Sequence, residues 1–181
     1  MTLASLLVVL TPPVTPYESG RDKEWPEIEM ALGTKLPGDY KEYINEFGTG
    51  RINDFLSPYN PFSENRFLNL LRQEPNQLDT LRRIRDEWGH EECPYPLYPE
   101  LQGLLPWGVT GNGNVLFWST SGPADEWTIV VSGGRNPGYE EFDEPMTNFL
   151  AKLLSRDIIS DFFRSFSARE AQFTPLVIVG K

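Results

Sequence analysis

Residues 25–50 read WPEIEMALGTKLPGDYKEYINEFGTG, and this stretch decides the fold because its spacing predicts two helices and the turn between them. Pro26 suits the first turn of a helix, where its missing N–H has no partner to lose. Gly33 can adopt the left-handed conformation that ends helices. The apolar residues before it are spaced i, i+3 and i+7, on one helical face: Trp25, Ile28 and Leu32.

A second helix is predicted to begin at Pro37. Asp39 falls in its first turn, where a carboxylate complements the positive end of the helix dipole. Gly48 and Gly50 end the pattern. Because a turn of about four residues joins the two helices, they must pack as a corner or a hairpin. The apolar residues of the second helix recur at i, i+3, i+4 and i+7: Tyr40, Tyr43, Ile44 and Phe47.

Weaker patterns lie on both sides of this stretch. Residues 67–88 have helical spacing, but Pro75 is expected to break or restart that helix. Residues 90–108 contain four prolines and are expected to be extended and irregular. Helices are also predicted at residues 3–10, docked on the core, and at residues 144–158. Strands are predicted around residues 52–56, 115–117, 128–131 and 139–142, and residues 173–179 form either a last strand or a docked extended segment.

Helices therefore come first, a run of strands follows, and a helix returns. This order predicts an α+β fold with a mixed or antiparallel sheet flanked by helices. We expect one domain over residues 1–181, since this length suits a single domain. Within it, residues 11–24 resemble a linker and residues 160–181 form a C-terminal extension.

The glycine-rich stretch PWGVTGNGNVLFW, residues 106–118, raises the question of a phosphate-binding loop. Two of its glycines have the outer spacing of a P-loop, but Asn114 and Val115 stand where Lys and Ser or Thr are required. The residues that follow favour a strand, so that no helix N-terminus would receive a phosphate. Asn112 and Gly113 are instead the pair that tight turns favour. The stretch predicts a turn between strands and no cofactor.

The charge of the chain limits its partners. The formal net charge is −10 at pH 7, which disfavours nucleic acid and anionic membranes because both carry phosphates. It favours a basic protein partner, or it serves only to keep the protein in solution. The single cysteine, Cys93, excludes an intrachain disulfide and favours a reducing, cytoplasmic compartment. The apolar run at residues 3–10 is shorter than the roughly 20 residues of a membrane helix.

His90 and Cys93, with Glu91 and Glu92 between them, are the candidates for metal binding or nucleophilic catalysis. A structural zinc site needs about four ligands, mostly Cys and His, and this chain has one of each. A Cys–His pair in a proline-rich loop also lacks an evident orienting partner. We therefore predict no metal site and no catalytic residues, and expect a protein that is not an enzyme.

Acidic residues stand beside aromatic ones in two stretches, PADEW at residues 123–127 and GYEEFDE at residues 138–144. Aromatic anchors surrounded by charge are typical of protein interfaces. A solvated strand face above buried aromatic residues would give the same pattern. The residues predicted to contact a partner are Asp125, Glu126, Trp127, Tyr139, Glu140, Glu141, Asp143 and Glu144.

The opening stretch resembles the signature of the SUKH (Smi/Knr-like) superfamily, W-x-x-I-E-x-x-L-G-x-x-L-P-x-D-Y-K. Further stretches resemble bacterial members, so that the resemblance extends over roughly residues 20–155: FGTG, INDF, NPF, LDTLR, LLPWGVTGNGNVLFW, DEW and MTNFLAKLL. The signature positions have structural explanations as helix stop, helix start and core: Trp25, Ile28, Glu29, Leu32, Gly33, Leu36, Pro37, Asp39 and Tyr40.

The resemblance implies an α+β domain with a mixed sheet flanked by helices. Many bacterial members are cytoplasmic immunity proteins that bind and neutralise a cognate polymorphic toxin domain, often a nuclease or a deaminase. Fungal members are regulatory hubs linked to cell-wall synthesis, and such an adaptor role is the alternative function. Neither branch is known for catalysis. We therefore expect a basic toxin domain as the partner of a monomer or weak dimer.

Overall fold

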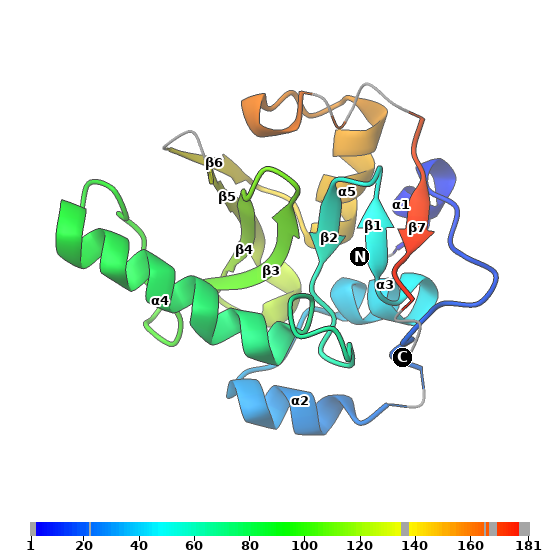
Figure 1. The fold of residues 1–181 in the computed structure, drawn as a ribbon, viewed down its shortest axis with the longest axis horizontal. Coiled ribbons are helices and arrows are strands. Elements are labelled where there is room, and N and C mark those ends of the chain that lie inside the picture. Colours follow the sequence, from blue (N-terminus) through cyan, green and yellow to red (C-terminus); the bar gives the residue numbers. More distant parts are fainter. Residues whose placement is uncertain (1–2, 22, 135–137, 165, 167–169, 178–181) are drawn as a thin grey trace.

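The computed structural model describes residues 3–21, 23–134, 138–164, 166 and 170–177 of the chain. Its centre is a seven-stranded sheet in the order β6-β5-β4-β3-β2-β1-β7 (Figure 1), and every pair of neighbouring strands is antiparallel. The strands are β1 Gly50–Ile52, β2 Leu56–Pro58, β3 Leu104–Thr110, β4 Val115–Ser119, β5 Thr128–Ser132, β6 Tyr139–Phe142 and β7 Phe173–Pro175.

Helices lie on both faces of this sheet. Helix α4 crosses one face, while α1, α3 and α5 gather on the other (Figure 1). This arrangement confirms the predicted single-domain α+β fold with helices around an antiparallel sheet. The helices are α1 Ala4–Val9, α2 Trp25–Leu32, α3 Gly38–Phe47, α4 Leu70–Trp88 and α5 Met146–Ser155, with two short 3₁₀ helices, η1 Ala124–Glu126 and η2 Asp161–Phe163.

Side chains alternate between the two faces of the central strands and so contribute to two hydrophobic clusters, one on each face of the sheet. Leu116 and Trp118 of β4 point into the larger cluster, which the buried residues of α1, α3 and α5 complete. Phe117, between them, points to the opposite face and packs with Leu78 and Leu81 of α4. Each fully buried side chain of this kind contributes about 1.5–3 kcal/mol. The sheet is therefore held by packing on both faces.

The predicted pair of helices is confirmed. Gly33 ends α2 with φ of 77°, and its N–H donates to the Glu29 carbonyl at 2.9 Å. Pro37 is the N-cap of α3, whose Tyr40, Tyr43, Ile44 and Phe47 are all fully buried. The predicted first helix is also confirmed, since α1 buries Leu6 and packs against α5.

The expected break at Pro75 is wrong. Helix α4 runs without interruption from Leu70 to Trp88 and contains Pro75 as its sixth residue. The proline cannot donate to the Leu71 carbonyl, which costs one helical hydrogen bond. Packing of the apolar face of α4 on the sheet outweighs this loss, because tertiary contacts supply most of the stability of a helix in a protein.

Residues 90–108 were expected to be irregular throughout, and this expectation is wrong for the last residues of the segment. Residues 104–110 form β3, which lies between β2 and β4 in the middle of the sheet. The register with β4 shifts between Pro106 and Gly108, so Trp107 is the extra residue of a bulge, and bulges are places where a sheet tolerates proline.

Residues 52–56, predicted as one short strand, belong to a hairpin. Asn53 and Asp54 have φ of 52° and 53°, so the chain reverses and Ile52 pairs with Leu56. At the other end of the chain, Phe173–Pro175 pairs with β1 as an outer strand. The last two residues of the predicted tail segment, 178 and 179, lie outside the described residues. Among the described residues, no helix combines the length and the apolar character needed to cross a membrane.

Candidate functional site

The turn predicted at Asn112 and Gly113 joins the two central strands. The Gly113 N–H donates to the Thr110 carbonyl, and the Thr110 N–H donates to the Asn114 carbonyl, both at 2.9 Å. Gly113 has φ of 85°, the left-handed conformation that ends a three-residue hairpin loop. Asn114 accepts the Gly134 N–H at 3.0 Å and so ties this hairpin to the loop after β5. The stretch is a β-hairpin, and it forms no phosphate-binding loop.

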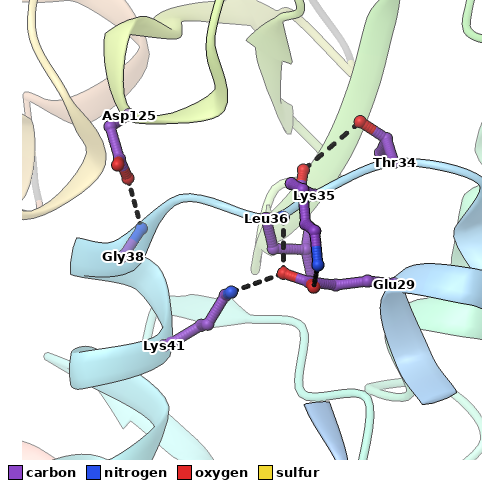
Figure 2. A network of polar contacts seen from close by, with 7 residues as sticks. All are labelled: Glu29, Thr34, Lys35, Leu36, Gly38, Lys41 and Asp125. Carbon is purple, nitrogen blue, oxygen red and sulfur yellow. Dashed lines mark hydrogen bonds and ion pairs between the residues drawn. The ribbon is translucent and has the colours of Figure 1, made fainter. Parts of the chain in front are cut away.

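The signature residues build a buried ion network beside the turn between α2 and α3 (Figure 2). The Glu29 side chain is 6% exposed and accepts hydrogen bonds from Lys35 at 2.8 Å, from the Leu36 N–H at 3.1 Å and from Lys41. Burial disfavours the charged carboxylate, but these three donors outweigh it and lower the pKa of Glu29 to about 2. Glu29 therefore stabilises the turn as an anion.

Asp39 acts on a different helix from its own. Its Oδ2 atom accepts the Thr147 N–H at 2.9 Å and the Thr147 hydroxyl at 3.0 Å. Thr147 is the second residue of α5, whose N-cap Pro145 has no side chain that can accept these bonds. The prediction placed Asp39 in the first turn of α3, which is confirmed, but its carboxylate serves as the cap of α5.

Asp125 connects the acidic region to this signature segment. Its Oδ1 atom accepts the N–H of Gly38, the first residue of α3, at 2.7 Å (Figure 2). A carboxylate is favourable there because the first N–H groups of a helix lack helical partners. The position of η1, and with it of Glu126, is therefore fixed against α3.

Trp127 is the predicted contact residue whose position differs most from the expectation. It is 4% exposed, its ring centroid lies 6.0 Å from that of Trp118, and its Nε1–H donates to the Gly122 carbonyl at 3.2 Å. Trp127 directly precedes β5, and its large apolar ring lies in the same cluster as Ile129 and Val131 of that strand. Trp127 thus supports the loop that carries the acids, and it offers a partner little surface.

Four of the predicted acids meet at one open pocket. Asp125 and Glu126 from η1 face Asp143 and Glu144 from the loop between β6 and α5, around a volume of about 310 Å³. Glu126 and Asp143 are exposed, and neither side chain has a hydrogen bond or ion pair with the described residues. Glu144 forms an ion pair with Lys152. We name this the acidic pocket; Trp127, Thr128, Pro145 and Asn148 complete its lining.

The remaining three predicted residues lie elsewhere, because side chains alternate along the edge strand β6. Tyr139 packs against Tyr95 with centroids 4.9 Å apart, and Glu141 accepts a hydrogen bond from the Tyr95 hydroxyl. Both therefore lie on the α4 face. Glu140 lies on the opposite face and accepts the Asp161 N–H at 3.2 Å. The structure splits the predicted group into the acidic pocket and these separate positions.

The candidates for catalysis do not form a nucleophile–base pair. Cys93 is fully buried in the α4-side cluster, and the Nδ1 atom of exposed His90 lies 3.1 Å from the Cys93 backbone oxygen instead of contacting the thiol. Within the described ranges, no three His, Cys, Asp or Glu side chains gather as a metal site would need.

Asn148 lines the acidic pocket from α5 and was not among the residues predicted from the sequence. Its side chain accepts a hydrogen bond from Ser5 of α1 at 2.9 Å. The available signal was its place in the helix, since Asn148 lies off the apolar stripe formed by Met146, Phe149 and Leu150.

Comparison with known proteins agrees with the fold and the signature. A protein-family model, SUKH_6, described as SMI1-KNR4 cell-wall, matches residues 22–151, well over half of the chain. No match was found among curated proteins or among solved structures. The matched region begins just before α2 and ends inside α5, so it includes the buried Glu29 network, the Asp39 cap and the acidic pocket. The chain therefore belongs to the SUKH, or Smi/Knr-like, superfamily.

Proposed function

We propose that this protein is a cytoplasmic immunity-type binding protein that neutralises a cognate polymorphic toxin domain of the nuclease or deaminase class. The observation that carries the proposal is the acidic pocket, where four carboxylates surround about 310 Å³ of open space. Family membership supports it, because SUKH proteins are generally non-enzymatic immunity or binding proteins.

The charges of the two partners favour such a complex. A domain that acts on nucleic acid needs a basic surface to hold phosphates. A chain with a net charge of −10 attracts that surface at long range, and fixed carboxylates can then cover it. Asp125 is held by the Gly38 N–H, while the side chains of Glu126 and Asp143 have no hydrogen bond or ion pair with the described part of the chain to give up on binding. The acidic pocket therefore combines a fixed frame with free acids.

Co-expression with the toxin-like gene beside this one tests the proposal. Wild-type protein is expected to restore growth and to bind the purified toxin domain. Glu126→Lys combined with Asp143→Lys is expected to lose rescue, because it reverses two exposed charges without removing a hydrogen bond or ion pair to any residue that the structure describes. Glu87→Lys combined with Glu91→Lys makes the same charge change at exposed positions outside the pocket and is expected to keep rescue.

Two results would contradict different parts of the proposal. If wild-type protein neither binds the neighbouring toxin nor rescues growth, the immunity function is wrong. If both double variants rescue like wild type, the function stands but the acidic pocket is not the contact surface.

A regulatory adaptor is the second candidate, and the cell-wall description of the matched family favours it. An adaptor would bind several cellular proteins through the same surface. Affinity purification would then return several cellular partners and no toxin domain. The Glu126→Lys, Asp143→Lys variant would raise the Kd for each of these partners, and this result would establish the alternative.

A further inference from the structure

A second and larger pocket lies where the chain enters α4. It has a volume of about 640 Å³ and shares no residue with the acidic pocket. Apolar groups and two arginines line it, and none of its described lining residues is Asp or Glu. We call it the arginine pocket; its lining residues are Arg66, Phe67, Leu71, Arg72, Gln73, Pro75 and Asn76.

Phe67 is exposed, although the nearby Leu68 and Leu70 are buried. It is 63% exposed, whereas Leu68 is 6% and Leu70 is 0% exposed. The guanidinium of Arg66 lies over the Phe67 ring, 4.6 Å from its centroid. Phe67 belongs to neither hydrophobic cluster. Neither cluster therefore accounts for this aromatic side chain, and an exposed aromatic ring beside an arginine is a combination that protein interfaces favour.

The charge of the arginine pocket contrasts with that of the chain. Among the described residues, neither Arg66 nor Arg72 forms an ion pair, although the net charge is −10. Other arginines do find carboxylates, such as Arg82 with Asp79 at 2.7 Å. Two unpaired guanidinium groups beside an apolar ring can bind a carboxylate through paired N–H donors.

The backbone around the pocket is held in place before any ligand arrives. Asn65 accepts the Phe67 N–H at 3.0 Å, and the Gln73 side chain donates to the Arg66 carbonyl at 2.9 Å. Pro75 has no N–H and so cannot donate to the Leu71 carbonyl, and both residues line the arginine pocket. A preformed site loses less conformational freedom on binding.

We propose that the arginine pocket binds a peptide segment of a protein partner that carries an acidic side chain next to an aromatic one. The carboxylate binds Arg66 and Arg72, and the aromatic ring packs on Phe67 and Leu71. A long nucleic acid fits less well, because the overall charge of −10 repels a polyanion while a short acidic segment meets only the local arginines. This site is independent of the proposed toxin contact.

Titration of the ¹⁵N-labelled full chain with a synthetic peptide, acetyl-Gly-Asp-Glu-Trp-Asp-Glu-Gly-amide, tests the proposal by NMR. Shift changes are expected to concentrate at residues 66–76. Arg66→Ala combined with Arg72→Ala is expected to raise the Kd about tenfold or more, because two charge-assisted contacts are lost. Phe67→Ala is expected to raise it by about fivefold. Arg83→Ala, at an exposed position of the same helix outside the pocket, is the matched control and should change it by less than about twofold.

Peptides and an oligonucleotide separate the alternatives. A peptide with Lys in place of Asp and Glu, and one with Ala in place of Trp, are both expected to bind more weakly. The proposal is overturned if the lysine peptide binds equally well, or if the Arg66→Ala, Arg72→Ala variant keeps its affinity. It is also overturned if single-stranded DNA displaces the peptide and binds more tightly, since the site would then be a nucleic-acid site.

Discussion

Asp39 of α3 caps α5 across 108 residues of sequence, because its carboxylate accepts both the N–H and the hydroxyl of Thr147. Thr147 is fully buried, and Asp39 is 5% exposed. Asp125 caps α3 in the same way through Gly38. Two carboxylates thus connect η1 to α3 and α3 to α5, which positions both sides of the acidic pocket.

Asp39→Ala should destabilise the protein by about 3 kcal/mol, because it leaves two buried donors of Thr147 without an acceptor. Urea unfolding followed by circular dichroism measures this change in the free energy of unfolding. Asp86→Ala, at an exposed position whose side chain has no hydrogen bond or ion pair with any described residue, is the control and should change it by less than about 0.5 kcal/mol. Equal effects of the two substitutions would show that the cap does not stabilise α5.

Glu29 should make stability depend on pH in the acid range. Its pKa is lowered from 4.5 to about 2 in the folded protein, so the unfolded chain binds the proton first as pH falls. The contribution of Glu29 is therefore complete above pH 4.5 and is lost as pH falls towards 2. The difference in unfolding free energy between wild type and Glu29→Gln should be largest at neutral pH and shrink over this interval. A difference that stays constant from pH 7 to pH 3 would be evidence against the ion network.

Gly48 and Gly113 should respond differently to the same substitution. Both have positive φ, but a Cβ at Gly48 would lie 2.1 Å from the Tyr17 carbonyl oxygen, whereas nothing lies within 4 Å of one at Gly113. Gly113→Ala should cost about 1–2 kcal/mol, the strain of the left-handed conformation alone. Gly48→Ala should cost clearly more, because the backbone of residue 17 must also move. Thermal unfolding of the two variants measures the order, and the reverse order would be incompatible with these contacts.

Association with the proposed toxin partner should slow as salt increases. Exposed charges are screened over about 10 Å at 0.1 M salt, so electrostatic attraction weakens at higher ionic strength. Stopped-flow measurement of the association rate should give a steep fall for wild type and a shallower one for the Glu126→Lys, Asp143→Lys variant. If wild type and variant show the same salt dependence, charge complementarity at the acidic pocket does not drive the encounter.

Local patterns in the sequence predicted much of the scaffold. The spacing of Trp25, Ile28 and Leu32 and the glycine after them define α2, because helix periodicity and helix termination are properties of a short segment. The Asn112–Gly113 turn could be predicted for the same reason, since only a few residues permit positive φ. These local signals, in their order along the chain, were enough to indicate an α+β fold.

The candidate site could be predicted only in part. The eight predicted contact residues are close in sequence, but alternation along β6 sends Glu140 to one face and Tyr139 and Glu141 to the other. The arginine pocket was not predicted, because phenylalanine is usually a core residue and only the folded structure shows that Phe67 is exposed. Exposure and pairing depend on every element that surrounds a side chain.

By itself, the sequence determined the turns, the helices with strong periodicity and the family signature. The tertiary structure decided that Pro75 remains inside α4, that residues 104–108 join the central strand, that Trp127 is buried and that Asp39 caps α5. The physical reason is the range of the interactions: backbone conformation follows neighbouring residues, whereas burial, ion pairing and capping depend on partners that only the folded chain brings together.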